Sequence, residues 1–352
     1  MNSEQAIETP AVVIDLAVAK KNIVRFQKHC DQHNIALRPH IKTHKLPSIA
    51  KLQISAGAVG ITCQKIGEAE VMENAGIKDI LITYNILGAS KLARLTNLSR
   101  RCNLSVVADN AHVIEGLAHA FSHDAKPLEV LIECDTGAGR CGVQSADEAL
   151  DLARKIHTSK GLTLGGLMTY PPMGNSKFVE DWLKKAKDTL LNNDLPCPKV
   201  SSGGTPNMWN AQEVRTADEH RSGTYIYNDR SLLSADLCDL EDCALSVQAT
   251  IVSTPTVDRA IIDAGSKMLT SDLLGLEGFG LIKEAPDASI SALSEEHGII
   301  DLSASNWAPK VGDTIHIIPN HACVVTNMVD HVYLIENGTI EKTAVLARGR
   351  VT

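Results

Sequence analysis

Eight short apolar runs, separated by longer amphipathic ones, recur between residues 35 and 227 and constrain the fold more than any other feature of the chain. The longer stretches 65–75, 146–158 and 179–192 have helical character, and Gly or Pro punctuates several of the joins. Strand and helix in near-strict alternation imply right-handed crossovers and a parallel sheet. Eight such units predict a closed (β/α)8, TIM-like barrel rather than an open doubly wound sheet. The predicted strands are 35–38, 59–62, 80–83, 104–108, 129–133, 164–168, 199–202 and 224–227.

After Asp229 the pattern changes to strand-like runs with no helical period between them. These runs are 246–252, 259–263, 314–318, 331–335 and 339–346. The sequence therefore predicts a barrel domain over residues 17–235 and an all-β domain over residues 236–352. A further strand within segment 8–16 precedes the first barrel helix, and we expect it to join the β domain rather than the barrel.

Composition narrows the class of partner. The formal net charge is -8 and no run of like charges is long. The chain therefore lacks the extended clusters of positive charge with which proteins bind nucleic acid or an anionic membrane. No segment reaches the roughly eighteen apolar residues of a membrane span. Nine cysteines, an odd number without framework spacing, indicate reduced thiols and a cytoplasmic protein. We therefore expect a small-molecule partner.

The stretch 37–45, Leu-Arg-Pro-His-Ile-Lys-Thr-His-Lys, carries five basic side chains in nine positions and no acid. Crowding of unpaired basic groups disfavours the protonated form of a lysine, and a neutral lysine is a nucleophile. On the strand count, Lys42 follows the first barrel strand, at the end where barrel enzymes build their active sites. The alternative is a solvated surface loop.

Glycine-rich turns accompany the last two predicted strands. Strand seven runs into Ser202-Gly203-Gly204-Thr205, and strand eight is introduced by Arg221-Ser222-Gly223-Thr224. Glycines at these positions let backbone N–H groups approach phosphate oxygens closely, and barrels commonly bind phosphate there. A Schiff-base lysine and a phosphate cradle at one end of a barrel together point to pyridoxal phosphate.

Strand five continues into a loop with three glycines and Arg140, which can hold an anionic oxygen by charge-assisted hydrogen bonds. The alternative is an ordinary loop in which Arg140 pairs with Glu133 or Asp135. Tyr170, just past strand six, and Gln64, past strand two, are predicted to face the same end of the barrel.

Motifs in order along nearly the whole chain resemble the D-threonine aldolase and D-serine dehydratase family, pyridoxal phosphate enzymes of the alanine-racemase-like fold type. The matching segments are 38–45, 135–142, 201–206, 221–225, 263–267, 294–298 and 319–323. One departure is visible at 169–172, Thr-Tyr-Pro-Pro, where better-known members have a tyrosine followed by glycine and histidine. The resemblance implies a homodimer that acts on D-amino acids.

The resemblance also implies roles for individual residues. It implies that Lys42, and not Lys45, carries the cofactor and is the catalytic residue, that Arg140 lies near the phenolic oxygen, and that Arg221 approaches the pyridine nitrogen. The phosphate would be held by Gly203, Gly204, Thr205, Gly223 and Thr224, and the remaining predicted cofactor contacts are Tyr170, Ser202 and Tyr225.

His321 and Cys323 form a candidate metal pair. At spacing i, i+2 on an extended segment, both side chains would point to one face and could coordinate one cation. The alternative is a buried free cysteine beside a hydrogen-bonded histidine. The resemblance favours the metal, because similar enzymes hold a divalent cation (Zn, Mn or Mg) at this pair.

The predicted function is a pyridoxal-phosphate- and metal-dependent lyase for D-3-hydroxy amino acids. It would act either by β-elimination from D-serine, D-threonine or 3-hydroxy-D-aspartate, or by retro-aldol cleavage. Because the His-x-Cys pair suits zinc and resembles the dehydratases, elimination is slightly favoured. The alternatives are an amino-acid racemase, which needs a second base and no metal, and a non-catalytic pyridoxal phosphate carrier.

Overall fold

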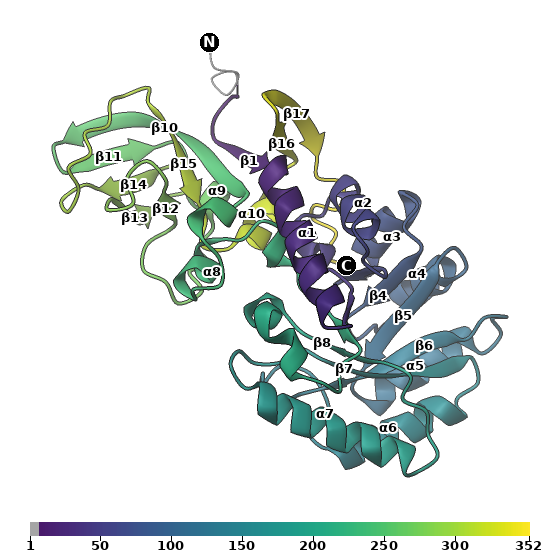
Figure 1. Ribbon diagram of the computed structural model, residues 1–352. Helices are drawn as coiled ribbons and strands as arrows, with labels where there is room; N and C mark the ends of the chain where they lie inside the picture. Colours follow the sequence, from purple (N-terminus) through teal and green to yellow (C-terminus); the bar gives the residue numbers. More distant parts are fainter. Residues whose placement is uncertain (1–6) are drawn as a thin grey trace. The chain divides into compact units, whose positions relative to one another are not determined.

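The computed structural model describes residues 7–352, which divide into two compact units (Figure 1). The parallel-sheet unit comprises residues 25–42, 47–223 and 350–352, and the antiparallel-sheet unit comprises residues 7–24, 43–46 and 224–349. This division differs from the predicted boundary after residue 235, because the chain passes into the antiparallel-sheet unit directly after Gly223. The divisions at Lys42/Thr43 and Gly223/Thr224 both adjoin predicted site residues.

The first unit is built on an eight-stranded sheet in which every neighbouring pair is parallel. Its order is β2-β9-β8-β7-β6-β5-β4-β3. The edge strands β2 and β3 are themselves linked, since the Thr62 N–H donates to the Pro39 carbonyl at 2.8 Å and His40 bridges Thr62. The strands are β2 (Ala36–Leu37), β3 (Ile61–Cys63), β4 (Asp79–Ile82), β5 (Asn103–Ala108), β6 (Leu128–Cys134), β7 (Leu162–Thr169), β8 (Val200–Ser202) and β9 (Glu219–His220).

Helices follow the strands in alternation, as the sequence pattern predicts. The helix α6 (Ala146–Thr158) begins after Ser145, whose hydroxyl accepts a hydrogen bond from the Glu148 N–H at 3.2 Å. Leu81, Val107, Leu131 and Met168, one from each of β4 to β7, form a fully buried cluster. The other helices of this unit are α2 (Pro47–Ser55), α3 (Ile66–Asn74), α4 (Ala89–Ser99), α5 (Ala111–Phe121), α7 (Ser176–Leu191) and the 3-10 helix η3 (Thr205–Glu213). The helix α1 (Leu16–Gln32) begins in the antiparallel-sheet unit and ends in this one.

The eighth predicted strand, 224–227, is wrong. Those residues begin a 3-10 turn, η4 (Thr224–Ile226), and the eighth strand is β9, Glu219–His220. The pair has no apolar residue, so an apolar run could not reveal it. Its buried polar side chains are instead satisfied inside the sheet. As a consequence, Arg221 and Gly223 follow the last strand rather than introduce it.

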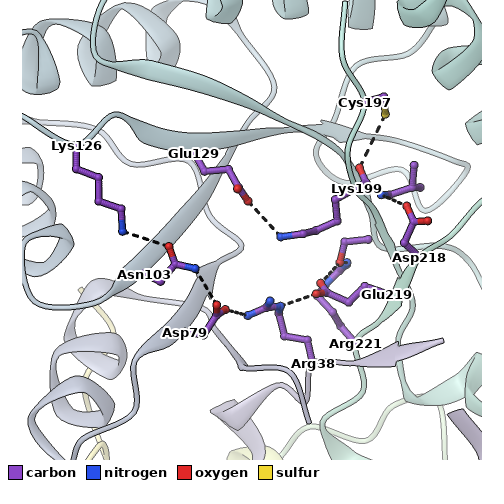
Figure 2. Close-up of polar contacts among 12 residues, drawn as sticks. Arg38, Asp79, Asn103, Lys126, Glu129, Cys197, Lys199, Asp218, Glu219 and Arg221 are labelled. Atoms are coloured by element: carbon purple, nitrogen blue, oxygen red, sulfur yellow. Dashed lines mark hydrogen bonds and ion pairs between the residues drawn. The ribbon is translucent and has the colours of Figure 1, made fainter. Parts of the chain in front are cut away.

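A chain of polar contacts replaces apolar packing beside β9 (Figure 2). Arg38 donates from Nε to Glu219 Oε2 at 2.7 Å and also pairs with Asp79. The Ser201 hydroxyl donates to Glu219 Oε1 at 2.6 Å and accepts from Arg221 Nη1 at 2.7 Å. Arg38 and Glu219 are both buried, so their charges are tolerated because they are paired and hydrogen-bonded.

Glu219→Gln is expected to lower the free energy of unfolding by about 3–5 kcal/mol, because it leaves Arg38 buried without its main counter-charge. Urea unfolding of the purified protein measures the change. Lys199→Met is the matched control: Lys199 pairs with Glu129 at 3.2 Å where both side chains are partly exposed, and its loss should cost less than about 1 kcal/mol. Equal losses in the two variants would contradict the importance of the buried pair.

The second unit is built on a nine-stranded sheet of order β11-β14-β13-β12-β15-β10-β1-β16-β17, in which β11 also pairs with β10. The N-terminal strand β1 lies in this sheet, antiparallel to β10 and parallel to β16. The strands are β1 (Ala11–Asp15), β10 (Leu245–Thr256), β11 (Arg259–Ile262), β12 (Leu281–Ile282), β13 (Ser289–Leu293), β14 (Gly298–Asp301), β15 (Thr314–Ile318), β16 (His331–Glu336) and β17 (Thr339–Ala344).

The expectation of a purely β domain is wrong in detail. The unit also contains the short helices α8 (Arg230–Ser234), α9 (Ser266–Leu269) and α10 (Ala322–Met328), and the 3-10 turn η5 (Leu240–Asp242). These helices are four to seven residues long, too short to show a helical period in the sequence. Over residues 7–352, none of the helices has the length and apolar character needed to span a membrane.

Candidate active site

Most of the predicted cofactor residues lie where the parallel strands end. Carboxyl ends of neighbouring parallel strands share one edge of a sheet, which we call the carboxyl edge. Lys42 lies in the 3-10 turn η2 (Ile41–Thr43) after β2, and Tyr170 directly follows β7. The others on this edge are Arg140 after β6, Ser202, Gly203, Gly204 and Thr205 at the end of β8, and Arg221 and Gly223 after β9.

The backbone of Lys42 is hydrogen-bonded, whereas its side-chain amine has no partner among the described residues. Its N–H donates to His40 Nδ1 at 3.3 Å, so His40 Nε2 carries the proton that is shared with Gln64 Oε1 at 3.1 Å. Gln64 is fixed in turn through Nε2, which donates to the Thr83 carbonyl at 2.8 Å. Within residues 7–352 no side chain hydrogen-bonds or ion-pairs with the Lys42 amine. Gln64 therefore supports the lysine turn.

The prediction that the basic stretch around Lys42 lacks acidic partners is wrong for Arg38. Burial acts to lower the pKa of Arg38, but the charges and hydrogen bonds of Glu219 and Asp79 outweigh it and raise the pKa above its ordinary value. Arg38 therefore belongs to the buried ion pairs beside β9. These partners lie about 40 and 180 residues further along the chain, beyond the reach of local sequence reading.

Arg140 makes neither of the ion pairs considered as alternatives. Its guanidinium lies 4.7 Å from the ring centroid of Tyr170, and among the described residues it has no hydrogen bond or ion pair. Asp135 instead accepts from the N–H groups of Gly137 and Gly139, at 2.9 and 3.1 Å, and so shapes the loop. The five donors of the guanidinium remain available to an anionic oxygen.

Glu133 is a candidate functional residue that the sequence suggested only as a partner for Arg140. It is 5% exposed, and no residue in the described part of the chain hydrogen-bonds or ion-pairs with its carboxylate. Burial, reinforced by the nearby charge of Asp109, raises the pKa of Glu133 to about 7 against the opposing charges of Arg140 and Arg221. The signal available in the sequence was an acid inside the apolar run of β6.

The glycines after β8 leave no room for side chains. Gly203 has a φ of +112°, and a Cβ there would overlap the ring of His220. A Cβ on Gly204 would lie 2.7 Å from Cε2 of Tyr170. No acceptor within residues 7–352 takes the Gly203 N–H, whereas the Gly223 N–H donates to Thr205 Oγ1 at 3.2 Å. The two predicted phosphate loops are thus tied together.

His220 and Arg221 are buried side chains at the end of β9, and the His220 ring lies against Gly203. Burial and the charge of Arg221 lower the pKa of His220 to about 3, so its imidazole is neutral. Arg221 donates from Nη2 to the Thr169 carbonyl at 2.7 Å. Burial lowers the pKa of Arg221 to about 10, which leaves it a cation at neutral pH. Arg221 is therefore a fixed positive charge next to β7 and β8.

Thr224, Tyr225, His321 and Cys323 belong to the antiparallel-sheet unit. The premise of an extended His-x-Cys segment is wrong, because His321 is the N-cap of α10 and Cys323 lies in its first turn. The two side chains nevertheless interact, since, against the lowering effect of burial, Cys323 acts to raise the pKa of the His321 imidazole. The N-cap residue is extended while the helix begins immediately after it, so sequence spacing alone could not give this geometry.

His321 is oriented by a carboxylate. Its Nδ1 lies 2.7 Å from Asp272 Oδ2, so Nδ1 keeps a proton and Nε2 is the nitrogen that becomes available to a metal once the ring is neutral. Burial acts to lower the pKa of His321, but Cys323 and Asp272 outweigh it and raise the pKa to about 9. A neutral imidazole and a thiolate are the ligands zinc prefers.

The pair offers two protein ligands and no third. Among residues 7–352 no group of three or more His, Cys, Asp or Glu side chains is arranged to hold a metal ion. A cation held by His321 and Cys323 would therefore keep several coordination positions for water or substrate oxygens, as catalytic sites do. This donor set fits a catalytic rather than a structural metal.

Comparisons with known proteins agree with this arrangement. Residues 14–231 match the family described as alanine racemase, N-terminal domain, and residues 244–335 match the putative serine dehydratase domain. The D-threonine aldolase of Arthrobacter sp. is 32% identical over 351 residues, which cover 95% of this chain and 91% of that protein. The D-threo-3-hydroxyaspartate dehydratase of Delftia sp. (strain HT23) is 32% identical over 349 residues, covering 90% and 91%.

A solved structure extends the likeness to three dimensions. It is a cysteine-to-alanine variant of D-threo-3-hydroxyaspartate dehydratase in the metal-free form, 30% identical, with a TM-score of 0.89 over 96% of this chain and 97% of that chain. The predicted resemblance is confirmed. The chain belongs to the family of D-threonine aldolases and D-serine dehydratases, lyases built on the alanine-racemase fold.

Proposed function

We propose that this protein is a lyase for D-3-hydroxy amino acids that depends on pyridoxal phosphate and a divalent metal. The observation that carries the proposal is the Lys42 amine, which has no hydrogen-bond or ion-pair partner among residues 7–352. It lies on the same carboxyl edge as Arg140, whose guanidinium contacts the Tyr170 ring and makes no hydrogen bond or ion pair with those residues. The named activities of the relatives, aldol cleavage and dehydration of D-hydroxy amino acids, support the substrate class.

We infer that the parallel-sheet unit is a closed (β/α)8 barrel. The hydrogen bonds between β2 and β3, from Thr62 to Pro39 and from Val59 to Leu37, support closure of the sheet. In such a barrel the carboxyl edge becomes a ring of loops around one opening, where a ligand reaches residues from several strands at once.

The residues of the carboxyl edge fit pyridoxal phosphate. Lys42 would hold it covalently, Gly203 would donate its unused N–H to the phosphate, and Arg140 would hold the phenolic oxygen. The chemistry that the cofactor supplies when bound is an electron sink for charge at the substrate's Cα. The Lys42 amine is the group on this chain placed to accept the proton from Cα or to return it.

The pair His321 and Cys323 fits a divalent metal, whose contribution when bound is Lewis acidity toward the substrate's β-oxygen. Asp272 holds the imidazole in the tautomer that leaves Nε2 for the metal. The softer nitrogen and sulfur donor set favours zinc. The resemblance of the His-x-Cys pair to that of the dehydratases favours elimination of the β-hydroxyl slightly over retro-aldol cleavage.

Product analysis tests the proposal and separates the two reactions. Protein supplied with pyridoxal phosphate and zinc should convert D-serine to pyruvate and ammonia and leave L-serine untouched. Glycine and acetaldehyde from D-threonine would instead assign retro-aldol cleavage within the same site. Interconversion of D- and L-alanine without carbonyl products would identify a racemase and overturn the proposal.

Gly204→Val is expected to weaken pyridoxal phosphate affinity at least about tenfold, because the added Cβ would press on the Tyr170 ring beside the phosphate loop. Titration of cofactor-free protein, followed by visible absorbance, gives the affinity. Gly116→Ala, in α5, is the control, since its added Cβ meets only Leu92 at 3.6 Å. Unchanged affinity in Gly204→Val would contradict the placement of the phosphate.

A further inference from the structure

The thiol of Cys323 hydrogen-bonds to two threonine hydroxyls, and this feature is not needed to bind a metal. Thr43 Oγ1 lies 3.1 Å from Cys323 Sγ, and Thr224 Oγ1 lies 3.5 Å from it. Both hydroxyls come from segments distant in sequence that meet at one sulfur within the antiparallel-sheet unit. Hydroxyl donors to a thiolate stabilise it and fix its direction where water cannot reach.

The two threonines are also neighbours in sequence of cofactor residues. Thr43 directly follows Lys42 and shares its 3-10 turn, and Thr224 directly follows Gly223, whose N–H donates to Thr205. Both peptide bonds are points where the chain passes from one compact unit to the other. Any constraint that the cofactor places on the backbone at Lys42 or Gly223 therefore acts on a hydroxyl that holds the metal-binding sulfur.

We propose that Thr43 and Thr224 couple the cofactor site to the metal site. The inference rests on the proposed function. Pyridoxal phosphate bound by Lys42 and the Gly223 loop would fix both hydroxyls, so that Cys323 is already oriented when the metal arrives. Since coupling of two binding equilibria is reciprocal, bound metal raises cofactor affinity by the same factor. Couplings of this kind are roughly 5- to 150-fold.

Zinc affinity provides the test without any turnover measurement. Competition against a chromophoric chelator gives the zinc dissociation constant of cofactor-free and cofactor-loaded protein. Absorbance titration with pyridoxal phosphate gives the reverse comparison, with and without zinc. Wild type is expected to bind zinc about tenfold more tightly when the cofactor is present, and to show the same factor in the reverse titration.

Variants then locate the coupling. Thr43→Val and Thr224→Val each remove a hydroxyl at nearly constant volume. They should bring the ratio of zinc affinities, cofactor-loaded over cofactor-free protein, toward one. Thr43→Ser keeps the hydroxyl and should keep the ratio, which controls for packing at this fully buried position. Thr326→Val is the matched control, because its hydroxyl donates to the Ala322 carbonyl in the same helix. Asp272→Asn should weaken zinc in both forms and leave the ratio unchanged.

The outcomes separate this inference from the proposed function. Equal zinc affinity of cofactor-free and cofactor-loaded wild type contradicts the coupling but leaves a metal-dependent lyase intact. The coupling is also contradicted if the ratio of zinc affinities between cofactor-loaded and cofactor-free protein stays the same in both Thr43→Val and Thr224→Val. Absence of zinc binding in wild type overturns the metal site itself, and the coupling with it.

Discussion

Lys42→Ala is expected to lose the visible absorbance of the lysine-bound cofactor and at least about a thousandfold of its lyase activity. The substitution removes both the covalent attachment point and the amine that handles the proton at Cα. Its backbone contact with His40 does not involve the side chain, so the turn should persist. Absorbance spectra of protein reconstituted with pyridoxal phosphate, together with initial rates on D-serine, measure the effect.

Lys45→Met provides the comparison for this variant. Lys45 is buried three residues further on, and methionine keeps the apolar stem of its side chain. This variant should retain the cofactor absorbance. Loss of absorbance in Lys45→Met with retention in Lys42→Ala would exchange the roles of the two lysines.

Cys323→Ala is expected to lower turnover about a thousandfold, or about 4 kcal/mol in activation free energy, while sparing the cofactor absorbance. The reason is that the metal acts on the substrate's β-oxygen, whereas Lys42 and the glycine loops hold the cofactor. Wild type stripped with a chelator should behave in the same way, and zinc should restore wild type but not the variant.

Thr326→Val serves here too as a control in α10, since its hydroxyl donates to the Ala322 carbonyl of the same helix. Elemental analysis must show that stripped wild type contains no metal. Full activity of that protein on D-3-hydroxy amino acids would contradict the role of His321 and Cys323.

The sequence predicted the strands that are apolar, and the prediction failed for the strand that is polar. Runs such as β5 and β7 are buried on both faces and read as continuous apolar segments, so they and their helices follow from the sequence. The strand β9 is Glu219–His220, and it exists because Arg38 and Ser201 satisfy a buried carboxylate. Such pairing depends on contacts far apart in the sequence, which periodicity cannot report.

The residues of the candidate site also differ in how well the sequence predicts them. Lys42 and the glycine pair Gly203–Gly204 have local signatures, a lysine and a tight turn just after apolar strands. Glu133 has only a weak signature, an acid inside the apolar run of β6. Asp272 has none, because its importance lies in a contact with His321 across 49 residues. The short helix that begins after His321 was missed because seven residues are too few to show a period.

Borohydride reduction of the cofactor-loaded protein, followed by proteolysis and mass spectrometry of the peptides, tests the central claim most directly. Every role assigned to the carboxyl edge depends on Lys42 as the residue that holds pyridoxal phosphate. We predict a single reduced cofactor adduct, on the peptide containing Lys42. An adduct on Lys45 or on a lysine of another loop, with Lys42 unmodified, would contradict the account.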